Sequence, residues 1–121
     1  QQQKVALAKV LAKNPDILLL DEPTKAIDGI YKESLGRLMM DLKNRGKTIV
    51  MVSHDLDFCG QYADRCGLFA QGNLIGVNNV RNFFTKNKFY TTSVNKMAGR
   101  SIENAVNKED VVCFLKAENI I

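Results

Sequence analysis

The feature that most constrains this chain is a short apolar run that ends in two acids. Four consecutive apolar residues, 17–20, lead directly into Asp21 and Glu22, and Pro15 and Pro23 bound the segment. A continuous apolar run of strand length is typical of a parallel strand covered on both faces, so we expect residues 17–20 to be fully buried. Ligands of open α/β sheets bind beyond the carboxyl ends of the strands. The two acids therefore stand where a ligand is expected.

A second strand is predicted at residues 48–52, which are rich in β-branched side chains. The apolar residues between the two strands recur at helical spacing, from Asp28-Gly29 to Arg45-Gly46. A helix between two strands is the crossover that a parallel βαβ unit requires, so we expect the strands to be parallel neighbours. His54, the only histidine, follows the second strand. It should therefore open onto the same edge as the two acids.

Other elements follow from capping and turn residues. Helix formers precede Asn14-Pro15, which predicts a helix over residues 1–13. The remaining expectations are a short helix capped by Asp55 and ending at Tyr62, a hairpin of 66–70 and 74–77 around Gln71-Gly72-Asn73, one or two helical turns at 80–84, and a final helix over 108–116 led by Asn107.

Composition excludes several classes of protein. The 121 residues are 45% hydrophobic, which suffices for one modest domain, and the apolar runs are far too short to span a bilayer. Cys59, Cys66 and Cys113 lack metal-binding spacing, so we expect free thiols. Residues 65–102 hold six bases and no acid. Such a block suits nucleic acid, anionic lipid or an acidic partner.

The motifs together resemble an ABC-type ATPase. The stretch Ile-Leu-Leu-Leu-Asp-Glu-Pro-Thr, with Ala26-Ile27-Asp28 after it, resembles the Walker B strand and D-loop of that family. Residues 1–8 resemble the helix that leaves the Leu-Ser-Gly-Gly-Gln signature, with Gln1 as its last residue, and residues 48–55 resemble the strand and switch histidine. The motifs occur in the family's order and at its spacings. The likeness covers roughly residues 1 to 75.

This resemblance implies an α/β fold, namely a partial P-loop NTPase domain of the ABC ATPase type. Its parts would be a parallel βαβ core with a terminal hairpin and a small helical tail. We expect residues 1–79 to form the C-terminal part of the ATPase domain and residues 80–121 to form the tail. No Gly-x-x-x-x-Gly-Lys-Ser/Thr phosphate loop occurs in the sequence, so we expect the chain alone to be inactive, although the full-length subunit would be an ATPase.

The resemblance also assigns roles to five residues, with ATP and Mg²⁺ as cofactors. Asp21 would hold Mg²⁺ through water, Glu22 would be the general base for the attacking water, and His54 would contact both the γ-phosphate and Glu22. Gln1 and Asp28 would face a nucleotide shared with a second subunit. The structural alternatives are that the two acids only cap a loop and that the lone histidine only packs.

The implied biology is a subunit that powers import of a small nutrient, a vitamin or a transition metal ion. Residues 89–98 and 108–112 resemble tails of energy-coupling-factor importers. The partners would be a second ATP-binding subunit, identical or different, and transmembrane subunits, at the cytoplasmic face of the membrane. Two departures stand out: Gly29 follows Asp28 where proline is frequent, and Lys25 replaces a small residue.

Two alternatives remain open at this point. A soluble ABC ATPase that acts on nucleic acid or the ribosome would use the basic block and the aromatic and basic residues of 83–90. Paired phenylalanines more often enter a small core, so we expect no nucleic acid. A catalytically silent interaction domain is the other alternative.

Overall fold

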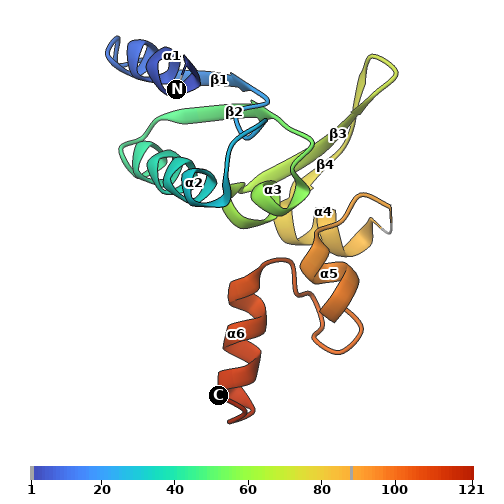
Figure 1. The fold of residues 1–121 in the computed structure, drawn as a ribbon. Helices are drawn as coiled ribbons and strands as arrows, with labels where there is room; N and C mark the ends of the chain where they lie inside the picture. The colour runs from blue at the N-terminus through green and yellow to red at the C-terminus, as the bar shows by residue number, and fades with distance from the viewer. Residues whose placement is uncertain (1, 88) are drawn as a thin grey trace. The chain divides into compact units, whose positions relative to one another are not determined.

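The computed structural model describes residues 2–87 and 89–121. Its contacts divide the chain into two compact units, which are unit 1 (residues 1–54) and unit 2 (residues 55–121). Figure 1 shows unit 1 from blue to green and unit 2 from green to red. The functional division at residue 79 expected from the motifs stays a prediction.

Unit 1 is a βαβ unit preceded by a helix. Helix α1 (Gln2–Leu11) leads into strand β1 (Ile17–Asp21), helix α2 (Gly29–Asn44) crosses over, and strand β2 (Thr48–Val52) returns (Figure 1). The strands pair in parallel, with Ile17 opposite Thr48 and Asp21 opposite Val52. The predicted pairing and crossover are therefore confirmed. The carboxyl ends of both strands lie at one edge.

The expected full burial of residues 17–20 is wrong. Leu18 is 4% exposed, whereas Ile17 and Leu19 are 62% and 75% exposed. Side chains alternate between the faces of a strand, and Val50 and Val52 share this exposed face at 52% and 62%. Leu18 lies on the opposite face, near Leu38 and Leu42 of α2, and α2 buries Leu35 and Met39.

In the part that the structure describes, unit 2 contains a hairpin and four helices. Helix α3 (Leu56–Tyr62) is followed by the antiparallel strands β3 (Arg65–Ala70) and β4 (Asn73–Asn79). Helices α4 (Val80–Lys86), α5 (Ser93–Ala98) and α6 (Lys108–Ala117) complete it (Figure 1). The predicted caps are confirmed: the carboxylate of Asp55 accepts from the N–H of Phe58, and Asn107 forms a capping box with Asp110.

The core of unit 2 is built on two phenylalanines. Phe84 is 1% exposed and Phe83 is 9% exposed, their rings meet edge to face at 5.1 Å, and Val106 packs with them. Cys59 and Cys66 lie against this cluster, and burial raises the pKa of the Cys66 thiol to about 11. That thiol stays protonated at neutral pH. The expected accessory core for the phenylalanine pair is thus confirmed.

Helix α5 is an element that the sequence pattern did not predict. Its first residue, Ser93, donates from its N–H and its hydroxyl to the two oxygens of Asp57, both at 2.7 Å. Thr92, which is fully buried, caps the same helix by accepting from the N–H of Asn95. The helix start therefore depends on a carboxylate from α3, 36 residues earlier.

Candidate functional site at the carboxyl ends of two parallel strands

Glu22 and His54 meet at the edge where β1 and β2 end. The imidazole Nε2 lies 3.5 Å from Glu22 Oε1, and the backbone N–H of His54 points to Glu22 Oε2 at 3.4 Å. The Glu22 side chain is 25% exposed, whereas the His54 side chain is 99% exposed. One wall of this pair is thus protein, and the other is open to a ligand. A carboxylate beside an imidazole can orient a water molecule and accept its proton.

The backbone holds Glu22 in an uncommon conformation. Its φ is +46°, in the left-handed region that residues with a side chain seldom adopt. Its N–H donates to the carbonyl of Val52 at 2.9 Å, and its carbonyl accepts from the N–H of Lys25 at 3.1 Å. These bonds turn the chain sharply after β1. Such strained backbone is frequent at functional sites.

Thr24 and Ser53 join the two loops that carry Glu22 and His54. Their hydroxyl oxygens lie 3.3 Å apart, and Thr24 is only 5% exposed. The sequence interpretation missed this pair. The signal was available, because Thr24 follows Glu22 by two residues and Ser53 precedes His54 by one. Thr24 follows Asp21 by three residues and Ser53 follows Val52 by one, so both hydroxyls lie just past the last strand pair.

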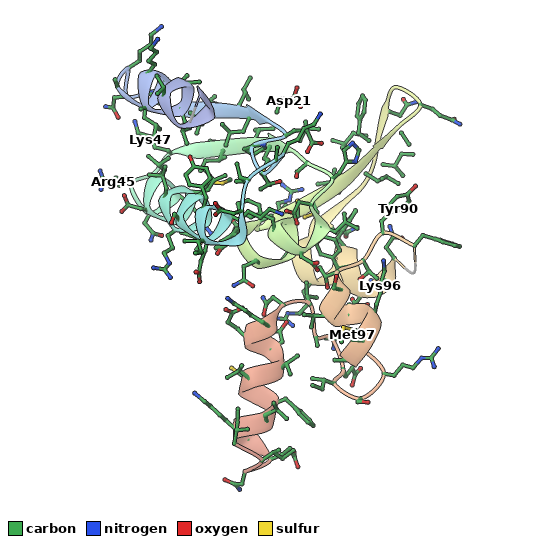
Figure 2. All side chains as sticks on the ribbon, in the orientation of Figure 1. Asp21, Arg45, Lys47, Tyr90, Lys96 and Met97 are labelled. Carbon is green, nitrogen blue, oxygen red and sulfur yellow. The ribbon has the colours of Figure 1, made fainter. Side chains whose placement is uncertain are left out.

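Asp21 is exposed at the last position of β1. Figure 2 shows it at the end of the strand that leads into the turn, away from Arg45 and Lys47. Mg²⁺ keeps most of its waters and binds through one or two carboxylates, so an accessible Asp21 followed by Glu22 fits such an ion. Within the described residues, no group of three histidine, cysteine or acidic side chains is placed to hold a metal by itself.

Asp28 is not brought to this pair by any contact that the structure describes. Asp28 is the N-cap of α2, and its Oδ1 accepts from the N–H of Tyr31 at 2.7 Å. The carboxylate therefore has a local structural role as a helix cap. Gln1 lies outside the described residues.

A cavity of about 280 Å³ in unit 1 lies at the other end of the strands. It is lined by Leu11, Asn14, Pro15, Leu18, Leu38, Asp41, Leu42, Arg45 and Lys47. Arg45 and Lys47 mark that end in Figure 2. Asp21, Glu22 and His54 are not among the lining residues, so this cavity is separate from the candidate site. Among the described residues, no helix combines the length and apolar character that a membrane span requires.

Comparison with known proteins adds a family to this geometry. A family model described as ABC transporter matches residues 1–25. A Bacillus thuringiensis protein with the provisional name of ABC transporter ATP-binding protein is 41% identical over 111 residues, which cover 92% of this chain. The arginine transport ATP-binding protein ArtM of Bacillus subtilis is 40% identical over 73% of the chain. The chain spans 20% of the first relative and 37% of ArtM.

Solved structures agree on the fold. The ATP-binding cassette MJ1267 of an ABC transporter, in its ADP conformation, matches 73% of this chain and 36% of its own with a TM-score of 0.63 and 21% identity. CbiO1 of Clostridium perfringens, part of the ABC transporter complex cbiONQ, matches 79% of this chain and 38% of its own with a TM-score of 0.62 and 32% identity. The chain has the α/β fold of ABC ATPase domains, and the sequence relatives and structural neighbours together support its assignment to part of an ABC transporter ATP-binding domain.

Proposed function

We propose that this chain carries the hydrolytic edge of an ATP-hydrolysing subunit that powers a membrane importer. The observation that carries the proposal is the contact between Glu22 and His54 at the ends of two parallel strands. A nucleotide phosphate and its attacking water need such a base and a nearby hydrogen-bonding group. The phosphate loop would come from another part of the full-length subunit.

Each side chain then has a distinct task. Glu22 orients the attacking water and accepts its proton, because its side chain is three-quarters covered by protein and still reachable. His54 hydrogen-bonds both Glu22 and the terminal phosphate through its exposed imidazole. It thereby registers whether the third phosphate is present. Asp28 and Gln1 contribute to a site shared with a second ATP-binding subunit.

Asp21 would hold Mg²⁺ through a water molecule at the end of β1. When bound, that ion neutralises charge on the phosphates. Asp21 stands one residue before Glu22, so a single turn of backbone would present a metal-binding carboxylate and a base to the same nucleotide. This arrangement needs no cage of acids, in keeping with the preference of Mg²⁺ for water.

The proposed transport role rests on the relatives. One relative is a phosphate import protein of Mycoplasma mycoides, 40% identical over 100 residues, and CbiO1 is part of a transporter complex. We propose an importer of a small nutrient of the energy-coupling-factor type, with a vitamin or transition metal ion as cargo. The subunit would dimerise around ATP at the cytoplasmic face and dock on transmembrane subunits.

The decisive experiment is Glu22→Gln in the full-length subunit. The amide keeps the shape of the side chain but does not accept the proton, so ATP turnover should fall by about two orders of magnitude or more. ATP binding and ATP-driven dimer formation should persist. The measurements are steady-state ATPase rates, nucleotide binding by fluorescence, and dimer formation by light scattering.

A matched control is Glu33→Gln, which changes an exposed glutamate on α2 that pairs with Arg37. Its ATPase rate should equal that of the unchanged subunit. If Glu22→Gln retained full turnover in a folded subunit, the assignment of the general base would be wrong.

A further inference from the structure

We propose that the hydroxyl pair of Thr24 and Ser53 is a positioning device that fixes Glu22 against His54. The inference rests on the proposed function, because it concerns the geometry of the same hydrolytic edge. Neither hydroxyl needs to touch nucleotide or water. Both are assigned to holding two loops in register.

The pair links the two loops close to the site residues in sequence. Thr24 lies two residues after Glu22, and Ser53 lies one residue before His54. Their hydroxyl oxygens are 3.3 Å apart although the residues are separated by 29 positions. A hydrogen bond there closes the end of the β1 and β2 ladder just beyond the last paired residues, Asp21 and Val52.

The contact between Glu22 and His54 is too weak to hold the two side chains in place by itself. Its two distances are 3.4 and 3.5 Å, at the long limit for hydrogen bonds, and the imidazole is almost fully exposed. Exposed contacts at such distances contribute little to conformational order. Glu22 also has a positive φ, which the surrounding structure must impose. The hydroxyl pair and the bond from Glu22 N–H to Val52 provide that restraint.

The hydroxyl contact is also long, at 3.3 Å, but unlike the imidazole it is shielded from water. Thr24 is 5% exposed and Ser53 is half-buried, so water competes poorly for their bond. A buried hydroxyl that loses its partner has no easy substitute. Replacing Thr24 with valine keeps the shape and removes the bond, so the loops lose register without a cavity. Since catalysis responds to displacements near 1 Å, hydrolysis should fall.

The test uses the full-length subunit with Thr24→Val, Thr24→Ser and Ser53→Ala. We expect kcat to fall about tenfold or more in Thr24→Val and Ser53→Ala, with KM for ATP within about twofold of the unchanged subunit. Thr24→Ser should restore kcat, because it keeps the hydroxyl. The double variant should be less impaired than the product of the two single effects, since both changes remove the same Thr24–Ser53 bond.

A second readout is independent of ATPase activity. In NMR spectra of the full-length subunit, the imidazole signals of His54 are identified as those that a His54→Gln variant loses. Thr24→Val and Ser53→Ala should shift these signals. The controls are Ser34→Ala, which removes an exposed hydroxyl bonded to Ile30, and Thr48→Val, which changes the exposed start of β2. Neither control should shift the signals or lower kcat.

The outcomes separate this inference from the proposed function. Unchanged kcat and unchanged imidazole signals in both Thr24→Val and Ser53→Ala would overturn the positioning role, as would a loss that Thr24→Ser does not restore. Shifted imidazole signals with full turnover in Glu22→Gln would leave the positioning role standing and remove the general base. If Thr24→Val does not fold, Ser53→Ala decides between these outcomes.

Discussion

Unit 1 and unit 2 use polar side chains in different ways. In unit 1, the acids and the imidazole gather at an open strand edge, beside a sheet face on which Leu19 is 75% exposed. In unit 2, the carboxylates of Asp57 and Asp110 are engaged by backbone N–H groups around a phenylalanine core. The comparison teaches that the acids of unit 2 are committed to short bonds with the backbone, whereas the Glu22–His54 contact of unit 1 is long and leaves the imidazole accessible.

The largest effect is expected in the core of unit 2. Phe84→Ala removes a ring that is 1% exposed, so unfolding free energy should fall by about 3–5 kcal/mol. Hydrogen exchange should accelerate in α4 before it does in β1 and β2, because α4 belongs to unit 2 and the two strands belong to the other compact unit. Phe89→Ala, at an 86% exposed position, is the control and should change stability by less than about 0.5 kcal/mol. Equal losses would remove the distinction between core and surface.

A smaller loss is expected from Gly60→Ala in α3. A Cβ at this position would lie 2.5 Å from the methyl carbon of Thr92 and 3.2 Å from a methyl carbon of Val106. Both residues are buried, so moving either of them to make room for the methyl group costs stability. We expect a loss of about 1–3 kcal/mol, measured by chemical denaturation. Gly29→Ala, where a Cβ meets nothing within 4 Å, should not reproduce it.

The pH dependence of stability at Asp110 tests whether the negative charge of a unit 2 carboxylate stabilises the fold. Burial alone would raise the pKa of this carboxyl, but hydrogen bonds from Arg81, Val106 and Asn107 and the charge of Arg81 lower it below its usual 3.8. Its stabilisation is therefore complete above pH 3.8 and is lost as pH falls through the lower folded value.

Asp110→Asn should cost about 1 kcal/mol at neutral pH, and the gap from the unchanged chain should close as pH falls below 3.8. Denaturation curves between neutral and strongly acidic pH measure this gap. A gap that persists unchanged at the lowest pH would show that the charge is not the cause. Glu109→Gln, at the exposed neighbouring position in α6, is the control and should leave the pH profile unaltered.

The smallest effect is expected at Asp28, where a candidate site residue is also a cap. Asp28→Ala removes the acceptor for the N–H of Tyr31, so α2 should lose about 1 kcal/mol, and Asp28→Asn should lose little. In the full-length subunit, Asp28→Asn keeps the capping acceptor and removes only the negative charge, so it separates the two roles. A lower ATPase rate with unchanged stability would add Asp28 to the hydrolytic edge, whereas an unchanged rate would leave it as a helix cap.

The local elements were determined by sequence alone. Caps at Asp28, Asp55 and Asn107 bind N–H groups three residues ahead, so each is decided within one helical turn. The apolar periodicity of α2 and the turn residues of the hairpin act over similar distances. Because such interactions need no distant partner, the βαβ order and the hairpin were predictable.

Only tertiary structure decided which residues meet across the chain. The register of β1 with β2 sets the contacts from Glu22 to His54 and from Thr24 to Ser53, which lie 32 and 29 positions apart. The start of α5 likewise required Asp57 from another helix. The exposure of Leu19 depends on which layers cover the sheet. A pattern of neighbouring residues carries no information on such covering layers, so sequence predicted the strand but not its burial.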